Sequence, residues 1–300
     1  MRPGTRDSYL EAIQRVITHV TTHLDDALDL EMLAADACLS PYHFHRVFRG
    51  MVGETPMEFV RRLRLERAAW RLATTTVPVT TVAFDAGYEA HEAFTRAFRQ
   101  HFGASPSEFR ATPRAHHHLA ASCGVHFDPR GHVPRFVPRS TGGSAMHVDI
   151  ETHPARRLAT VRHLGPYNQI GRAFGELGQR LGPAMGALAM HGAAMIALYH
   201  DDPDSVAPAD LRADAAMVVP DEFELPPGVT EQRLPAGRYA STLHVGPYEQ
   251  LGDVWQRFMG EWLPASGERV ASSPAVETYL NNPETTPKEQ WRTLLSIPLA

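Results

Sequence analysis

The sequence predicts a multidomain protein: an N-terminal all-α domain with two helix-turn-helix units, then an α+β domain of two pseudo-symmetric strand-helix-strand-strand repeats. Two internal duplications point to this architecture. Residues 44–49 (Phe-His-Arg-Val-Phe-Arg) recur as residues 94–99 (Phe-Thr-Arg-Ala-Phe-Arg), and residues 163–167 (His-Leu-Gly-Pro-Tyr) recur as residues 244–248 (His-Val-Gly-Pro-Tyr). Apolar residues follow helical spacing in the first half and gather in short strand-like runs in the second.

The first helix-turn-helix unit is expected at about residues 30–53, after a packing helix within residues 7–25 whose apolar side chains recur at helical spacing. Ser40 is a typical N-cap, and Pro41 fits the first position of the helix that follows it. Gly53 ends this second helix of the unit. The segment therefore has the helix, turn and helix that place one helix in a DNA major groove.

A linker helix is expected at about residues 56–74, because Thr55 is followed by a capping-box Glu58. The second unit follows at about residues 79–103, with its first helix beginning near Thr80 or Thr81. The linker helix is about 28 Å long at 1.5 Å per residue, whereas successive half-sites on one face of DNA lie about 34 Å apart. We therefore expect a single chain to bind DNA as a monomer.

The formal net charge of −5 argues at first against a nucleic-acid partner. The excess of acid lies wholly in the second half, since residues 1–115 hold 14 basic and 14 acidic residues, and residues 116–300 hold 15 and 20. Residues 41–71 hold seven Arg against three Glu. This basic segment fits DNA phosphates, although a charge run of this kind is also typical of a solvated helix face.

Residues 8–112 resemble the DNA-binding domain of the AraC/XylS family of transcription regulators. The motif that carries the resemblance comprises Ala86, Gly87, Tyr88, Phe94, Arg96, Phe98, Arg99, Gly103, Ser105, Pro106 and Arg110. The resemblance implies double-stranded DNA as a partner, and RNA polymerase as a second one. It is confined to this N-terminal part of the chain.

The same resemblance implies which side chains face DNA. They are Tyr42, His45 and Arg46 in the first reading helix, and His91, Glu92, Thr95 and Arg96 in the second. Arg49 and Arg99 are either structural residues or phosphate ligands. His43 is expected on the exposed face together with Tyr42 and His45, while the phenylalanines of both helices belong to the core.

Residues 113–145 are rich in Pro and Gly and are expected to form a partly ordered linker that couples the two halves flexibly, with some extended structure around residues 125–127 and 135–137. A histidine triplet at 116–118 lies in it, but no Cys accompanies the triplet, so we expect no metal site and no cofactor. Cys38 and Cys123 are far apart in sequence and are expected to be reduced thiols.

The second half carries its repeats about 80 residues apart. Residues 159–163 suggest a strand, the Gly-Pro-Tyr that follows suggests a turn into a helix, and two further strands are expected around 194–200 and 214–219. Residues 146–300 resemble the GyrI-like small-molecule-binding domain, which also occurs as the effector domain of multidrug-responsive regulators.

That resemblance implies a small-molecule effector between the two repeats, with Glu277 as the acidic residue that contacts it. Strand alternation places Glu277 and Tyr279 on one face, and Ala197 is the equivalent of Glu277 in the first repeat. A carboxylate among aromatic rings favours a flat, lipophilic cation. The aromatic candidates are Tyr167, Phe174, Tyr199, Tyr248, Trp255, Tyr279 and Trp291.

Simpler roles remain open for several of these residues. Glu277 could point to solvent from a half-buried sheet, and Tyr167 and Tyr248 could hold the turn at the start of each helix. Phe174 and Trp291 fit the core as well as they fit a ligand site.

Together the two halves predict a one-component regulator and not an enzyme. One alternative is a hydrolase of reactive small molecules with Glu277 as general acid or base, and another is a protein-interaction module. The sequence has no apolar run of about 18 residues and no signal peptide pattern, so we expect a cytoplasmic protein.

Overall fold

The computed structural model describes residues 1–300 except 1–4, 113–117, 139–145, 191–192, 202–205 and 272. The chain divides into two compact units, residues 1–141 and residues 142–300, and each is described here by itself. None of the helices in the described parts of the chain is long and apolar enough to cross a membrane.

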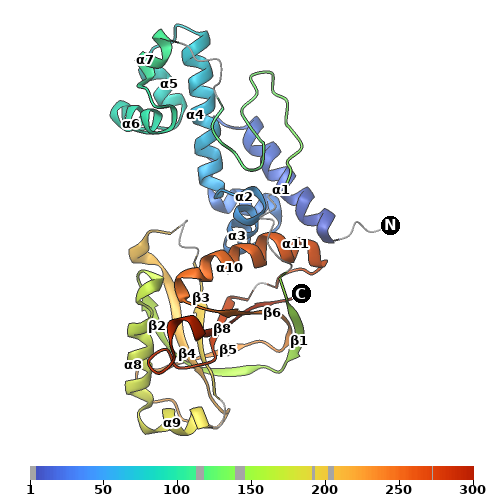
Figure 1. Ribbon diagram of the computed structural model, residues 1–300, viewed down its shortest axis with the longest axis vertical. Coiled ribbons are helices and arrows are strands. Elements are labelled where there is room, and N and C mark those ends of the chain that lie inside the picture. Colours follow the sequence, from blue (N-terminus) through green and yellow to red (C-terminus); the bar gives the residue numbers. More distant parts are fainter. Residues whose placement is uncertain (1–4, 113–117, 139–145, 191–192, 202–205, 272) are drawn as a thin grey trace. The chain divides into compact units, whose positions relative to one another are not determined.

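The N-terminal unit is helical, as expected (Figure 1). Its helices are α1 (Thr5–Thr22), α2 (Leu30–Ala37), α3 (Pro41–Val52), α4 (Pro56–Thr74), α5 (Val79–Asp85), α6 (His91–Phe102) and α7 (Pro106–Ala111). The two predicted helix-turn-helix units are α2–α3 and α5–α6. The expected start of α5 is corrected by one or two residues, because the helix begins directly after Pro78.

The capping residues act as the sequence predicts. The Ser40 hydroxyl accepts from the backbone N–H of His43 and starts α3. Thr55 and Ser105 each form a complete capping box, at the starts of α4 and α7. These bonds satisfy backbone N–H groups that a helix leaves without partners at its first turn.

The turns inside the two units have the same hydrogen bonds. Cys38 and Gly87 both take positive φ, 57° and 83°. Cys38 N–H donates to Ala35 O at 2.9 Å and the next N–H to Ala34 O at 3.0 Å, and the second unit repeats both bonds at 2.9 and 3.2 Å. The first unit thus uses a cysteine where the second uses a glycine, the residue that pays least for this backbone conformation.

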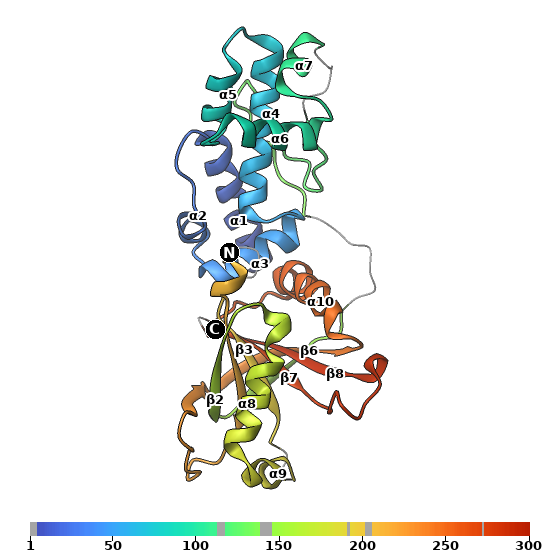
Figure 2. The same ribbon diagram turned by 90° about the vertical axis from the view of Figure 1, so that its left-hand side faces the viewer.

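Helix α4 runs from the α2–α3 unit to the α5–α7 end of the domain (Figures 1 and 2). Most of the arginines between residues 41 and 71 form hydrogen bonds or ion pairs within this domain. Arg64 Nε donates to Leu24 O at 2.9 Å, Arg67 Nη1 lies 2.7 Å from Asp25 Oδ1, and Arg71 Nη1 lies 2.5 Å from Asp85 Oδ2. These contacts tie the loop after α1 and the end of α5 to α4.

Residues 118–138 of the expected linker, which we call the strap, are held on α4 by hydrogen bonds. Its anchor is Glu66 on α4, a carboxylate with about 1% of its surface exposed. Glu66 accepts from Leu119 N, Phe127 N and His126 Nδ1 at 2.9, 2.9 and 3.0 Å. Arg62 also donates to Val125 O at 2.9 Å, so the strap belongs to the N-terminal domain. Residues 116 and 117 of the histidine triplet lie outside the described residues.

The C-terminal unit is an eight-stranded antiparallel sheet with the order β1-β6-β8-β7-β3-β4-β2-β5. The strands are β1 (Asp149–His153), β2 (Arg156–Leu164), β3 (Met195–Tyr199), β4 (Arg212–Val218), β5 (Thr230–Leu234), β6 (Gly237–Val245), β7 (Ala275–Tyr279) and β8 (Arg292–Pro298). β3 and β7 pair at the centre, so the two repeats meet there about a pseudo-twofold axis.

Each repeat contains one strand more than the sequence predicts. β1 precedes the first repeat but pairs with β6 of the second, and β5 precedes the second repeat but pairs with β2 of the first. The repeats therefore exchange their leading strands at the two edges of the sheet. β1 and β5 are short and largely exposed, with a polar sequence that lacks the alternation typical of a half-buried strand.

The helices of this domain lie between consecutive strands along the chain. They are η1 (Tyr167–Gln169), α8 (Gly171–Leu181), α9 (Pro183–Met190), η2 (Pro208–Asp210), η3 (Tyr248–Gln250), α10 (Leu251–Arg257), the π-helical turn η4 (Phe258–Trp262), α11 (Leu263–Ser266) and η5 (Lys288–Gln290). Leu177 of α8 packs on Ala159 of β2 and Ala215 of β4. We call the side of the sheet that bears these side chains its helix-covered face.

Candidate DNA-reading helices and candidate effector site

The phenylalanines of α3 and α6 lie in the core, as expected. Phe44, Phe48, Phe94 and Phe98 have no exposed surface. Their spacing leaves one face of each helix directed away from the core.

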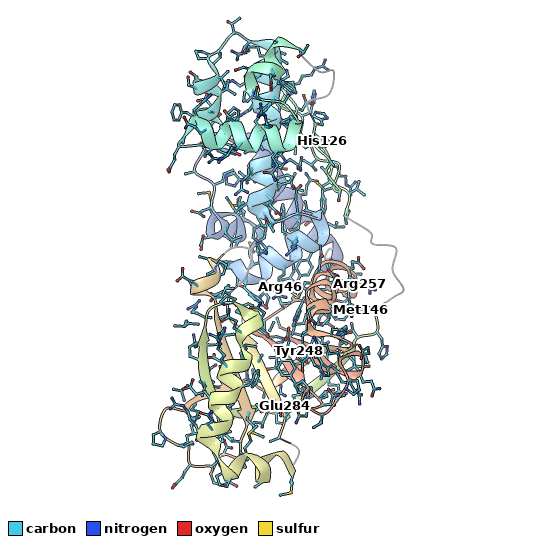
Figure 3. All side chains as sticks on the ribbon, turned by 60° about the vertical axis from the view of Figure 1, so that its left-hand side comes forward. Arg46, His126, Met146, Tyr248, Arg257 and Glu284 are labelled. Carbon is cyan, nitrogen blue, oxygen red and sulfur yellow. The ribbon has the colours of Figure 1, made fainter. Side chains whose placement is uncertain are left out.

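On α3 the expected exposed face is narrower than predicted. His43 and His45 are both buried, which corrects the expectation for these two residues, because they flank the apolar stripe instead of lying opposite it. Burial, together with the nearby positive charge of Arg46, lowers the pKa of His43 to about 4, so its ring is neutral at physiological pH. The guanidinium of Arg46, a residue labelled in Figure 3, lies 4.7 Å from the centre of the Tyr42 ring. Arg49 is exposed.

On α6 the expected DNA-facing side chains share one side of the helix. Glu92 and Arg96 are exposed, while His91 and Thr95 are half-buried, with His91 Nε2 3.5 Å from Thr95 Oγ1. Arg99 Nη2 lies 3.4 Å from Glu108 Oε2, and both side chains are 62% exposed. An ion pair as exposed as this one contributes little to stability.

The repeated His-x-Gly-Pro-Tyr motif closes the turn after each long strand. His163 Nε2 lies 3.0 Å from Pro166 O, and His244 Nε2 lies 3.2 Å from Pro247 O. Gly165 and Gly246, which lie between the histidine and the proline of each motif, take positive φ of 124° and 142°. The Tyr167 hydroxyl holds the first turn against the end of β3, because it donates to the carbonyl oxygen of Asp201 at 2.6 Å.

Glu277 is buried on the helix-covered face of β7, with about 4% of its surface exposed. This excludes the alternative in which it points to solvent. Its Oε1 accepts from the indole Nε1 of Trp255 at 2.7 Å. Its Oε2 accepts from the hydroxyls of Tyr199 and Tyr279 at 3.1 and 3.0 Å. Three of the aromatic residues predicted for the effector site therefore hold the predicted carboxylate directly.

The other aromatic candidates surround this group. Tyr279 is in edge contact with Phe174 and Tyr248 at ring-centre distances of 5.5 and 5.3 Å, and Tyr167 lies 4.7 Å from Tyr199. Tyr248, labelled in Figure 3, also contacts Trp291, with 4.3 Å between the two ring centres. The Nε1 of Trp291 donates to Thr286 O at 2.9 Å.

The carboxylate also changes the acidity of the phenols around it. Burial, and then the neighbouring Tyr199 and Glu277, raise the pKa of Tyr279 well above its ordinary range. Burial and the charge of Glu277 raise the pKa of Tyr248 in the same direction. Both phenols therefore keep their protons at neutral pH, and Tyr279 donates its proton to Glu277.

A second group of charged residues, which the sequence analysis did not predict, lies on the opposite face of the sheet. Asp214 is buried, and it accepts from Arg162 Nε at 2.6 Å and from Gln232 Nε2 at 2.7 Å. His200 Nε2 lies 2.5 Å from the same carboxylate. Because strand alternation separates this group from Glu277, it has no place in the effector site.

Two domain families match the chain. A family of GyrI-like small-molecule-binding domains matches residues 146–300, and a helix-turn-helix family matches residues 33–112. Regulatory protein SoxS of Salmonella typhimurium is 34% identical over 103 residues, which are 34% of this chain and 96% of SoxS.

The second half has curated relatives as well. The DNA gyrase inhibitor of Serratia proteamaculans is 38% identical over 149 residues, 46% of this chain and 90% of the inhibitor. Among solved structures, the C-terminal domain of EcmrR is 18% identical, with a TM-score of 0.41 over 52% of this chain and 99% of that domain.

Proposed function

The chain belongs to the GyrI-like family of small-molecule-binding domains and carries an AraC-type helix-turn-helix domain, and on this premise we propose that it is a transcription regulator controlled by an aromatic cation. Helices α3 and α6 read the operator, and the C-terminal domain binds the effector. The observation that carries the effector class is the buried carboxylate of Glu277 among aromatic rings, because charge and cation–π attraction both favour a cation there.

The effector half of the proposal is tested by titrating the full chain with ethidium and with tetraphenylphosphonium. Glu277→Gln keeps the size of the side chain and removes its charge, and it should weaken binding of both cations at least about tenfold, as expected for a desolvated charge. Glu249→Gln is the matched control, since Glu249 also lies beside the site on η3 but is 70% exposed. Equal binding by wild type and Glu277→Gln would contradict the role of the carboxylate.

The DNA half rests on two reading helices joined by α4 in one chain. We propose that Arg46 and Arg96 contact base edges, that one chain occupies one operator, and that RNA polymerase is the protein partner. Arg96→Ala should cost about 1–3 kcal/mol and relax one base position. Arg238→Ala is the control, because Arg238 pairs with Glu268 in the other domain. Binding of two chains per operator would contradict the monomer.

The hydrolase alternative is tested with reactive electrophiles that are chemically related to these cations. A reactive electrophile mixed with the protein should be recovered unchanged if the domain only binds its ligands. Turnover that disappears in Glu277→Gln would instead assign Glu277 as general acid or base.

A further inference from the structure

On the helix-covered face the two repeats differ in polarity at the positions around the central tyrosines. Where the second repeat has Glu277, the first has Ala197, which is its Cα partner across β3 and β7. Where the second repeat has Trp255, which donates to Glu277, the first has Phe174 at the same distance after the Gly-Pro-Tyr turn. The second repeat therefore supplies the carboxylate and the indole N–H of the site, while Tyr199 of the first repeat donates to the same carboxylate.

Thr293 continues this pattern. It is the Cα partner of both His244 and Tyr279, just as Ala213 in the first repeat is the partner of His163 and Tyr199. Thr293 therefore occupies the position of Ala213 and shares the face of Tyr279 and Glu277. The first repeat again has alanine where the second has a polar side chain.

The hydroxyl of Thr293 differs from the other polar groups of the site in one respect. Thr293 has no exposed surface, yet its Oγ1 has no hydrogen-bond partner among the residues that the structure describes. A buried hydroxyl without a partner costs about 1–3 kcal/mol, and valine would fill the same space without that cost. A threonine in this place therefore points to a partner that binds from outside the chain.

We propose that Thr293 is a second polar contact of the effector site and hydrogen-bonds an atom of the effector. The inference rests on the proposed function and narrows its ligand class. Thr293 and Glu277 are diagonal neighbours on β8 and β7, with Cβ atoms about 7 Å apart. The effector is then an aromatic cation that also carries a hydrogen-bonding group near its charged centre, with both directed to the second repeat.

The ligand-free protein gives the first part of the test. Thr293→Val removes the unpartnered hydroxyl at constant shape, so the melting temperature should stay the same or rise. Thr242→Val is the matched control, because Thr242 is also buried on this face but donates to His147 O at 2.8 Å. It should lower the melting temperature. If Thr293→Val lowers it equally, the hydroxyl has a structural partner and the inference is overturned.

Binding gives the second part, with nucleic-acid-free protein. Ethidium carries aromatic amines, whereas tetraphenylphosphonium has no hydrogen-bonding group. Thr293→Val should weaken ethidium binding about three- to tenfold and leave tetraphenylphosphonium binding unchanged, and Thr293→Ser should restore ethidium binding. Equal loss for both cations, or loss for neither, overturns the inference.

The two proposals fail in different ways. If the wild type binds tetraphenylphosphonium alone, the proposed function stands and the role of Thr293 is overturned. If the wild type binds neither cation, the proposed effector class fails, and the role of Thr293 fails with it.

Discussion

Ala197 and Glu277 are direct Cα partners in the β3–β7 ladder at the centre of the sheet, and they hold the same position in the two repeats. Directly opposed side chains on antiparallel strands have Cβ atoms about 5 Å apart. The pseudo-twofold axis passes between the two residues, so two identical repeats would place two carboxylates against each other here. The alanine removes that repulsion and leaves a single charge at the centre.

Ala197→Glu should therefore destabilise the domain in a pH-dependent way. A like charge raises the folded-state pKa of a carboxyl group above its unfolded value near 4.3. The Ala197→Glu variant then loses stability as the pH rises from the unfolded-state pKa through the higher folded-state pKa. Ala197→Gln is the control for size, and Ala197→Glu should be less stable than it by about 1–2 kcal/mol at pH 8. Urea denaturation should show this gap closing towards pH 4; a gap independent of pH would refute the explanation.

Cys38→Gly should stabilise the N-terminal domain. Cys38 has a φ of 57° in the turn that Gly87 makes with a φ of 83°. An L side chain costs about 1 kcal/mol in this conformation, and part of that gain is offset by the greater freedom of glycine in the unfolded chain. We expect a net gain of about 0.5 kcal/mol in urea denaturation.

The reverse change tests the same relationship. A Cβ atom added at Gly87 would lie 2.9 Å from Nη1 of Arg64, so Gly87→Ala meets both an unfavourable φ and a steric contact. It should destabilise by more than Cys38→Gly stabilises. A stabilising Gly87→Ala would show that the turn is not held in this conformation.

Glu66→Gln should release the strap from α4. The amide has one oxygen, so it cannot accept all the bonds that Leu119 N, Phe127 N and Arg62 now donate. We expect a loss of about 3 kcal/mol, typical of a broken buried ion pair. Hydrogen exchange should accelerate at the amides of Leu119 and Phe127. Arg61→Gln, an exposed change on the same helix, should leave both amides protected.

The sequence predicted the parts of the fold that local signals determine. Capping residues such as Ser40 and Thr55 start helices whatever surrounds them, and the duplications revealed the pseudo-symmetry. The exchange of β1 and β5 could not be predicted, because exposed edge strands carry no hydrophobic pattern. The attachment of the strap to α4 could not be predicted either, since it depends on the buried Glu66, which in the sequence looks like one more charge on a polar helix face.

The candidate site also contains residues that were predicted and one that was not. Glu277 and its aromatic neighbours were expected through the resemblance of the repeats to a known family, but Thr293 was missed. Its environment depends on the register of β6, β7 and β8. Comparing the two repeats position by position, which the offset of about 80 residues permits, would have revealed the change from Ala213 to Thr293.

The same comparison singles out the charged group on the other face of the sheet. Arg162, His200 and Asp214 correspond to three leucines in the second repeat, namely Leu243, Leu280 and Leu294. Burial disfavours ionisation of Asp214, but hydrogen bonds from His200 and Gln232 and the charge of Arg162 outweigh it, so the pKa of Asp214 is lowered.

A carboxyl group with a lowered pKa contributes stability above its unfolded pKa, near 3.9, and loses it as the pH falls through the lower folded value. Asp214→Asn should therefore cost about 2 kcal/mol at pH 7, since it leaves Arg162 without its counter-charge, and the difference from wild type should shrink below pH 4. Replacing all three residues by leucine recreates the second repeat, and the triple variant should lie within about 1 kcal/mol of wild type. Urea denaturation at pH 7 and pH 3.5 measures both effects. If the triple variant is less stable than Asp214→Asn, the leucines of the second repeat depend on surroundings that the first repeat lacks.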